Sequence, residues 1–346
     1  MGQFHTDGDY VSDGAEYDHG TNPEDEDTYN DGLSDRQEIY YYGTYGYTWD
    51  SDEDRMSDKE EVDIYHTDPL VRNDRYAVLI AGGWNKYENY AWFWNSLMFM
   101  YDILVDKYRY FQENVYVLYA DGNLPSNRNC YDPEHVIYHP NVIDFAATKL
   151  NLQTVFSQLA SRMDKNDFLF IYITDHGDTD STYSYICLWN EKKIKDSEFA
   201  GNDYLGRITS YDHMVIVLGQ CFGGGFLDDL AKVDRVVVSA SRDTEKAYIC
   251  DNHPSEEGYY AEFLYQLMIA VNGAKPDETK VNADRDGNGY ISMKEAYLYA
   301  FSHDSYNPDG DLYVQHDSNG DGRADDEMQE HPQICEFFTL AERCYL

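Results

Sequence analysis

The sequence lacks any run of about 18 uncharged apolar residues, the length at which a membrane-spanning helix is expected. No basic segment followed by an apolar stretch stands near its start, so no signal peptide is visible. Basic residues are scarce too, with 26 Lys and Arg against 65 Asp and Glu and a net charge of −39. An acidic surface repels phosphate backbones, so we expect no nucleic-acid partner. The 346 residues suffice for one large domain or two moderate ones.

The acidic residues are concentrated in two stretches of the chain. Residues 1–70 contain 21 Asp and Glu against 3 Lys and Arg, and residues 281–330 contain 12 against 3. A charge run is commonly a solvated, disordered tail. Carboxylates in a fixed register instead supply the oxygen ligands that Ca²⁺ prefers. The spacing of the carboxylates therefore decides between these two interpretations.

Alternating carboxylates occur three times near the start of the chain. The tetrapeptides GTNP, GTYG and HTDP begin at positions 20, 43 and 66, so the unit repeats every 23 residues. Each unit carries carboxylates at some or all of positions 1, 3, 5, 9 and 12 of a calcium loop. They are Asp7, Asp9, Asp13 and Glu16 in the first loop, Asp27, Asp31, Asp35 and Glu38 in the second, and Asp50, Asp52, Asp54, Asp58 and Glu61 in the third. This register predicts bound calcium. We expect weaker calcium binding or strain in the first and third loops, because Tyr10 and Arg55 respectively replace the turn glycine. The segment resembles the thrombospondin type-3-like calcium repeats of secreted microbial proteins.

Two further loops near the end of the chain follow the EF-hand spacing. The stretch DRDGNGYISMKE places ligand types at the expected positions, namely Asp284, Asp286, Asn288, Tyr290, Ser292 and Glu295. The stretch DSNGDGRADDEM does so in part, with Asp317, Asn319, Asp321, Arg323 and Asp325. Met328 stands at its position 12, where Glu327 or Glu330 would have to replace it. We expect calcium in the first of these loops and treat the second as a candidate.

Between residues 75 and 275, short apolar runs alternate with longer mixed segments. The runs are rich in β-branched and aromatic residues and lack polar alternation, as in strands that are buried on both faces of a parallel sheet. They cover residues 76–82, 114–120, 168–174, 213–219 and 235–241. Helices are expected over 91–106, 151–164 and 258–272. This order predicts an α/β fold, whose ligand site lies beyond the carboxyl ends of the strands.

Two of these strands end in chemically capable residues. FLFIYIT is followed by Asp175, His176 and Gly177, and HMVIVLG by Gln220 and Cys221. A lone histidine there is more often structural, and a buried cysteine is usually a small hydrophobe or half of a disulfide. Together, an imidazole and a thiol at one sheet edge can form a thiolate–imidazolium pair that attacks a carbonyl. The glycines at 223–225 leave room for a substrate backbone and free N–H groups for an oxyanion.

The segments FIYITDHG and VIVLGQCFGGG resemble the two signature segments of legumain-type and caspase-like cysteine peptidases. AVLIAGG, NVYVLYADG and VVVSASRDTEKAY resemble neighbouring segments of that family, over about residues 75–275. The resemblance implies a caspase-hemoglobinase three-layer α/β sandwich. It implies that Cys221 is the nucleophile, that His176 protonates the leaving amine, and that the N–H groups of Gly177 and Cys221 bind the oxyanion. It also implies that Asn89 orients His176.

The expected substrate pocket departs from that of the relatives. Legumains carry an arginine and an acidic residue where this chain has Ala91 and Gly219, so their preference for asparagine is not transferred. Caspases have a glutamine two residues before the cysteine, whereas Gln220 stands directly before it. We expect Ser241 and Asp243 to line the pocket, together with Gly219.

The resulting expectation is a calcium-stabilised, secreted or cell-surface cysteine endopeptidase that cleaves proteins or peptides. We expect a calcium-binding repeat segment over 1–72, a catalytic domain over 73–279, EF-hand-like loops over 280–330 and a closing catalytic segment over 331–346. Two other functions stay open at this point: a catalytically silent adhesion or interaction module on a peptidase fold, and a transamidase or ligase that uses the same Cys-His dyad. Five cysteines besides Cys221 allow up to two disulfides, whose pairing the sequence does not determine.

Overall fold

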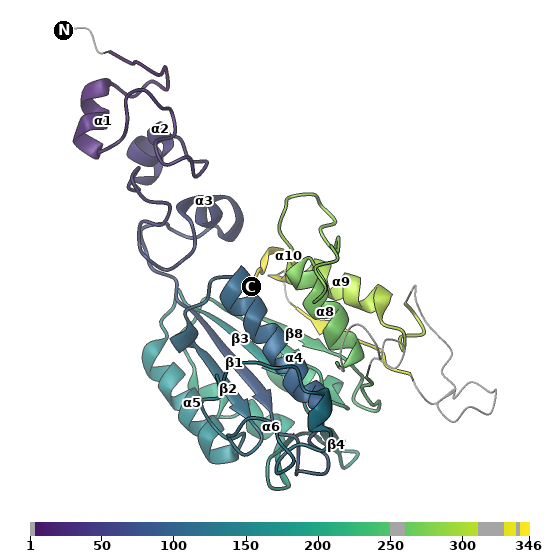
Figure 1. Cartoon of the computed structure of the whole chain (residues 1–346). Coiled ribbons are helices and arrows are strands. Elements are labelled where there is room, and N and C mark those ends of the chain that lie inside the picture. Colours follow the sequence, from purple (N-terminus) through teal and green to yellow (C-terminus); the bar gives the residue numbers. More distant parts are fainter. Residues whose placement is uncertain (1–3, 250–259, 311–328, 337–339) are drawn as a thin grey trace. The chain divides into compact units, whose positions relative to one another are not determined.

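The computed structural model describes residues 4–249, 260–310, 329–336 and 340–346. The chain divides into two compact units, Met1–Asp74 and Arg75–Leu346. The helices and strands of both units are drawn in Figure 1.

The first unit consists of three loop–helix repeats. A serine caps the start of each helix, and in the last two repeats it forms a capping box with the residue three positions on. The helices are α1 (Asp13–His19), α2 (Asp35–Gln37) and α3 (Asp58–Glu60), the last two continuing into wider turns over Glu38–Tyr42 and Glu61–Tyr65. One buried apolar residue precedes each serine: Val11, Leu33 and Met56. Each repeat therefore folds around one small apolar contact and one capped helix start.

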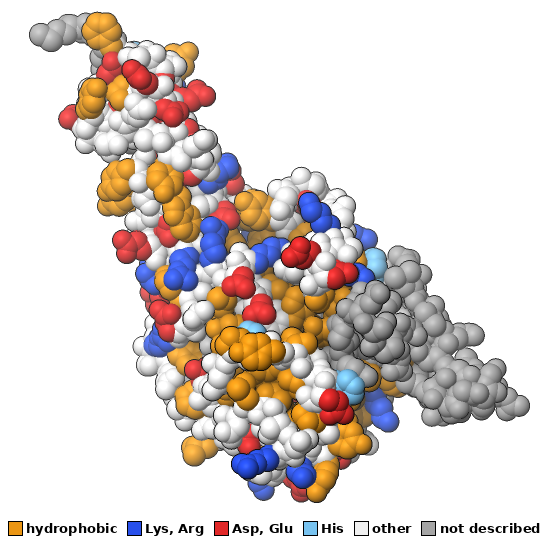
Figure 2. All heavy atoms as spheres, in the orientation of Figure 1, with side chains coloured by type: hydrophobic (Ala, Val, Ile, Leu, Met, Phe, Trp, Pro, Cys, Tyr) orange, Lys and Arg blue, Asp and Glu red, His pale blue; other side chains and the backbone are white. Residues whose placement is uncertain are grey.

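Most of the other large side chains of this unit face solvent. Figure 2 shows acidic side chains in red and aromatic ones in orange on its surface. The exposed aromatic residues are Phe4, Tyr10, Tyr17, Tyr29, Tyr40, Tyr41, Tyr45 and Tyr47. The unit buries little apolar surface, and this burial contributes little to its free energy of folding. The carboxylate loops are therefore its main structural feature.

The second unit is built on a six-stranded sheet in the order β2-β1-β3-β7-β8-β9. The first five strands run parallel and β9 is antiparallel to β8. Their bounds are β1 Arg75–Ala81, β2 Val115–Tyr119, β3 Phe168–Ile173, β7 His213–Leu218, β8 Arg235–Ser239 and β9 Gln333–Cys335. Three shorter strands form a separate antiparallel sheet after β3: β4 Gly177–Thr179, β5 Ser184–Leu188 and β6 Lys192–Lys195.

Helices cover both faces of the large sheet (Figure 1). One core cluster packs the sheet against α4 (Ala91–Asp102), α8 (Glu262–Asn272), α9 (Met293–His303) and α10 (Leu340–Arg343). The other packs it against α5 (Lys149–Arg162), α6 (Asp196–Phe199) and α7 (Leu227–Leu230). Successive residues of each strand alternate between the two clusters, so all residues of β1, β2, β3 and β8 are buried. The predicted three-layer α/β sandwich with a mostly parallel sheet is confirmed.

The predicted strands and helices all occur within a few residues of their expected bounds. The sequence missed the small sheet β4–β6 because its strands are only three to five residues long and contain polar residues such as Asp178, Lys192 and Lys195. Within the described residues, none of the helices is long and apolar enough to cross a bilayer.

A core substitution on α5 tests the second face of the sandwich. Phe156 is fully buried, and its ring meets Phe199 and Tyr204 edge-on at 5.8 and 6.4 Å. We expect Phe156→Ala to lower the free energy of unfolding by about 3–5 kcal/mol, through lost burial and the cavity that remains. Leu150→Ala, on the same helix but 70% exposed, should change it by less than about 0.5 kcal/mol. Denaturant unfolding of both variants measures the difference, and equal losses would contradict the assigned packing.

Candidate active site

A buried carboxyl group ties the end of β3 to the end of β1. Asp175, two residues beyond β3, accepts hydrogen bonds from the backbone N–H groups of Gly82, Gly83 (2.9 Å) and His176 (2.7 Å). Its complete burial raises the pKa of this carboxyl to about 8, against the opposing effect of the three N–H groups. No role for Asp175 is expected from the sequence. The structure shows that it holds the β1 loop against the backbone of His176.

The imidazole of His176 is oriented by a main-chain carbonyl. Its Nε2 lies 2.7 Å from the oxygen of Glu88. Because a carbonyl can only accept, Nε2 carries the proton in the neutral ring and Nδ1 keeps the lone pair. Phe93 and Tyr90 meet the ring edge-on at 5.0 and 5.8 Å. Burial lowers the pKa of His176, which outweighs the opposing effect of Glu88, so the ring is neutral at pH 7.

The role expected for Asn89 is wrong in its detail. The side-chain amide of Asn89 donates to the hydroxyl of Tyr119 (2.9 Å) and to the carbonyl of Asn129 (2.6 Å), and makes no hydrogen bond to His176. The carbonyl of the preceding residue, Glu88, orients the imidazole instead. Asn89 is fully buried and braces the loop that presents this carbonyl.

Cys221 follows β7 at the same sheet edge. Its Sγ accepts a hydrogen bond from the N–H of Ala247 (3.3 Å) and lies 3.8 Å from the carbonyl oxygen of Ala247. Burial raises the pKa of the thiol, although the N–H groups of Ala247, Gly177 and Cys221 itself act to lower it. Both pKa shifts favour the neutral forms of the two groups over the thiolate–imidazolium pair expected from sequence.

Gly177 lies directly against the backbone of Cys221. A Cβ atom at position 177 would lie 1.8 Å from the carbonyl oxygen of Cys221, so no other residue fits without a shift of the backbone. The N–H groups of both residues act on Sγ. The structure thus brings together the two N–H groups that the resemblance assigned to the oxyanion hole.

The three predicted pocket residues lie in different surroundings. A Cβ on Gly219 would lie 2.2 Å from Cδ1 of Leu264, so α8 fills the space where legumains carry an acidic side chain. Ser241 is fully buried and its hydroxyl donates to the carbonyl of Gln220 at 3.4 Å. Neither residue is among those that line the two cavities found in the described part of the chain, and their contact with substrate stays a prediction.

Asp243 does line a cavity, which has a volume of about 530 Å³. The cavity lies between β4–β5, the turn after Cys221 and the segment after β8. Its polar wall includes the carboxyl groups of Asp196, Asp228 and Asp243 and the hydroxyls of Thr179 and Ser181. Phe222, the residue next to Cys221, also lines it. The cavity thus adjoins the candidate nucleophile and carries negative charge.

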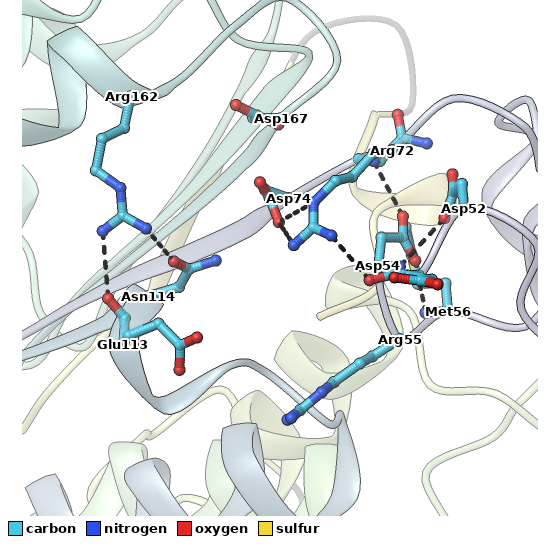
Figure 3. A network of polar contacts seen from close by, with 12 residues as sticks. Asp52, Asp54, Arg55, Met56, Arg72, Asp74, Glu113, Asn114, Arg162 and Asp167 are labelled. Atoms are coloured by element: carbon cyan, nitrogen blue, oxygen red, sulfur yellow. Dashed lines mark hydrogen bonds and ion pairs between the residues drawn. The ribbon is translucent and has the colours of Figure 1, made fainter.

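Two of the three repeat loops of the first unit bring carboxylates together in clusters. Asp7, Asp9 and Glu16 form one cluster and Asp50, Asp52 and Asp54 another, each with ligand atoms within 4.8 Å of one another. In the third loop, Asp54 also accepts the N–H groups of Met56 (2.7 Å) and Asn73 (3.0 Å), and Arg72 pairs with Asp74 nearby (Figure 3). Oxygen-only clusters of this kind fit a hard cation such as Ca²⁺.

The glutamates at position 12 are the most constrained of these carboxylates. Glu16, Glu38 and Glu61 are fully buried, and each has at least one carboxylate oxygen without a hydrogen-bond partner in the described part of the chain. Burial, followed by repulsion from neighbouring carboxylates, raises their pKa values to about 7, 8 and 9. A cation would relieve both effects, so these residues fit a metal site.

The aspartates at position 9 brace their loops, and their role as calcium ligands stays a prediction. Asp13, Asp35 and Asp58 each accept two hydrogen bonds, from the N–H and hydroxyl of Thr6, Thr28 and Ser51 respectively. These bonds close each loop onto the first turn of its own helix. Position 9 therefore braces the loop and stands outside the carboxylate clusters found in the described residues.

The loop at 284–295 has the geometry of its sequence pattern. Asp284, Asp286 and Glu295 come together within 4.8 Å. Asn288 contacts Asp286, and Ser292 caps α9 through Glu295. Tyr290 donates its N–H to Asn288 at 2.8 Å, and its carbonyl as a ligand stays a prediction. The second candidate loop, with Asp317, Asn319, Asp321, Arg323 and Asp325, lies outside the described residues.

Comparison with known families decides the enzyme class. The Peptidase C13 family model matches residues 75–283, which contain His176 and Cys221. The chain belongs to the peptidase C13 family. The bacterial TSP3 repeat matches residues 6–25, 27–44 and 50–71, which are the three loop–helix repeats. No curated protein matches the chain. The second unit of this C13 protein is thus a cysteine peptidase that acts on protein or peptide substrates, as the legumain-like segments implied.

The cysteines of this C13 peptidase are unpaired where the structure describes them. Cys130, Cys187, Cys221, Cys335 and Cys344 are all free thiols. The two disulfides allowed by the cysteine count are therefore absent among these five, and Cys250 lies outside the described residues.

The close contact of Gly177 with Cys221 gives a direct test of the site. We expect Gly177→Ala to abolish cleavage and to destabilise the second unit by about 3 kcal/mol or more, because the added methyl meets backbone that is fixed by β7. Gly14→Ala is the control, since no atom lies within 4 Å of its Cβ position. Peptide cleavage and unfolding are measured for both. A fully active Gly177→Ala variant would contradict the assigned geometry.

Proposed function

We propose that the protein is a calcium-stabilised cysteine endopeptidase that acts through a Cys221–His176 dyad and an acyl-enzyme intermediate. The observation that carries this proposal is the arrangement around Cys221. Its Sγ lies among the N–H groups of Gly177, Cys221 and Ala247, and His176 stands at the adjoining strand end with Nδ1 free to accept a proton. A nucleophile, a base and oxyanion donors are the parts that acyl transfer needs.

The neutral resting dyad defines the order of proton movements. As Sγ attacks the scissile carbonyl carbon, its proton passes to Nδ1 of His176 and the C–S bond forms. The carbonyl oxygen becomes an oxyanion bound by the N–H groups of Gly177 and Cys221. His176 then protonates the leaving amine as the C–N bond breaks, leaving a thioester. Water, deprotonated by His176, hydrolyses the thioester and restores the thiol.

The hydrogen bond from Nε2 to Glu88 supports this sequence. When Nδ1 gains a proton the ring becomes cationic, and the carbonyl of Glu88 stabilises the positive charge. In the described chain, no hydrogen bond joins His176 to Cys221 directly. The proton transfer therefore takes place with the substrate bound between them, as is common for catalytic contacts that tighten only in the complex.

The cavity beside Phe222 is the proposed site for a substrate side chain. It holds three carboxyl groups and no Lys or Arg among its lining residues. Asp243 keeps the substrate-binding role that the sequence proposed, at a position next to the turn after Cys221. The carboxyl groups of this wall would stabilise a basic or polar side chain of the substrate.

Replacement of the nucleophile tests the dyad. We expect Cys221→Ala to reduce cleavage of a diverse peptide library by at least about 10³-fold, because the acyl-enzyme can no longer form. Cys335→Ala is a matched control, since this thiol is also free and half-buried but lies on β9. Cleavage that survives Cys221→Ala would refute the nucleophile assignment. A folded wild type without cleavage would favour the silent-module alternative, and peptide joining in place of hydrolysis would favour the ligase.

The neutral dyad predicts a specific pH dependence. The pKa of His176 lies below its ordinary value of 6.5 and the pKa of Cys221 above its ordinary value of 9.0. We expect kcat/KM to fall only as pH drops below 6.5, where the imidazole gains a proton and can no longer act as a base. Between pH 7 and 9 it should not decline. A decline in that range would indicate that the imidazolium is required in the free enzyme, contrary to this assignment.

Metal removal tests the calcium proposal. Calcium at about 100 times its dissociation constant stabilises a folded unit by about 2.7 kcal/mol per site, so EDTA should lower the melting temperature of the first unit. Glu38→Gln should remove the contribution of one loop, because it weakens the buried ligand at position 12. Glu24→Gln, an exposed neighbour, should have no effect. Equal melting temperatures with calcium and with EDTA would contradict calcium stabilisation.

A further inference from the structure

Three carboxyl groups outside the repeat loops meet inside the second unit. Asp304 follows α9, Glu262 begins α8 and Glu330 precedes β9. Asp304 and Glu330 are fully buried and Glu262 is 4% exposed. Glu330 donates its N–H to the carbonyl of Tyr306 at 3.2 Å, and Glu262 accepts the N–H of Ser305 at 3.2 Å, so all three residues lie at the turn that follows α9. This group, Glu262, Asp304 and Glu330, is called the buried acidic cluster below.

Asp304 and Glu330 each have one carboxylate oxygen that accepts a hydrogen bond and one that has no partner among the described residues. Oδ1 of Asp304 accepts the N–H of Tyr306 at 2.9 Å, and Oε2 of Glu330 accepts the N–H of Tyr248 at 2.8 Å. Oδ2 of Asp304 and Oε1 of Glu330 are buried and have no hydrogen-bond partner among the described residues. No Lys or Arg in the described chain forms an ion pair with any of the three carboxyl groups.

Two buried carboxylates that face each other need a positive charge between them. An unpaired buried carboxylate costs several kcal/mol, and a second one adds repulsion. A proton shared by the pair would remove one charge and leave the other beside Glu262. A divalent cation would neutralise both and use the two vacant oxygens as ligands. Because every available donor is oxygen, the fitting ion is a hard one such as Ca²⁺.

The buried acidic cluster is connected to the wall of the active site through Tyr248. Its N–H donates to Glu330, and its carbonyl accepts the N–H of Glu262 at 2.9 Å. Its ring stacks on Tyr306 at 4.7 Å, two residues beyond Asp304. The preceding residue is Ala247, whose N–H and carbonyl contact Sγ of Cys221. Displacement of the cluster would therefore move the segment that faces the nucleophile.

A second connection reaches the same segment two residues earlier. Glu245 pairs with Nδ1 of His331 at 2.9 Å and accepts the N–H of His331 at 3.2 Å. The carbonyl of Glu245 accepts the N–H of Phe222, the residue after Cys221, at 2.7 Å. The segment 245–248 is thus attached at both ends to residues next to the buried acidic cluster.

We propose that Asp304 and Glu330, with Glu262 beside them, bind a calcium ion that fixes the segment 245–248 against Cys221. This site is distinct from the repeat loops and from the loop at 284–295. In this proposal Glu330 binds the same ion as Asp304. It therefore does not serve as the replacement ligand that the spacing suggested for the loop at 317–328. The effect on catalysis rests on the proposed peptidase function, whereas the binding of the ion does not.

The decisive measurement is the number of calcium ions bound per full-length chain. The wild type is compared with Asp304→Asn/Glu330→Gln by equilibrium dialysis at about 1 mM free calcium, a concentration suited to extracellular sites. The amide pair fills the same space without charge. We expect one ion fewer in the double variant. Glu342→Gln, an exposed carboxylate of the closing segment, should bind the wild-type number. If the double variant does not fold, Asp304→Asn alone is measured, with the same expected loss.

Cleavage is measured alongside as a function of free calcium. We expect the calcium dependence of kcat/KM in the wild type to weaken in the double variant, because its neutral pair holds the segment without an ion. An unchanged calcium number in a folded variant overturns the proposed site and points to a shared proton. A lost ion in a protein that cleaves nothing upholds the site and rejects the peptidase function, so the two failures are distinguishable.

Discussion

The register of β3 against β7 is the constraint on which the active site depends. Ile173 pairs with Leu218 at the ends of these strands, and both are fully buried. A slip by one residue would turn every side chain of a strand towards the opposite core cluster, so the pairing is strongly specified. His176 and Cys221 each stand three residues beyond these paired ends. The two hydrophobic faces of the sheet thereby determine where an imidazole and a thiol meet.

The chemistry at that edge comes from main-chain groups that packing holds in place. A carbonyl from the loop before α4 orients the imidazole, and N–H groups from Gly177 and Ala247 surround the thiol. Burial shifts the pKa of His176 down and that of Cys221 up, so it favours the neutral form of both groups. Burial of titratable groups also matters in the acidic regions, where the buried groups are carboxylates. There, we propose that a cation neutralises buried carboxylates without partners, and that a calcium ion at the buried acidic cluster would also fix the segment beside Cys221.

The parts of the molecule that follow from local pattern were predictable, and the parts that follow from distant packing were not. Unbroken apolar runs predicted the five parallel strands, and therefore that His176 and Cys221 follow neighbouring strands at one edge of the sheet. The role of Asn89 failed because a spacing cannot distinguish its amide from the carbonyl one residue earlier. Spacing also does not show that Leu264, on a helix 45 residues later in the chain, occupies the space of a side chain at position 219. The position-9 aspartates matched a ligand pattern, and spacing alone does not show that their carboxylates accept hydrogen bonds from the start of each loop.

The central claim is that the fold makes Cys221 a nucleophile served by His176, and covalent labelling tests it most directly. The folded protein is incubated with an electrophilic peptide, and the adduct is located by mass spectrometry among its six cysteines. We expect one adduct, on Cys221, which forms at least about tenfold more slowly in His176→Ala because the base is lost. Labelling of another cysteine in its place, or an unchanged rate without the imidazole, would show that Cys221 is not a nucleophile served by His176.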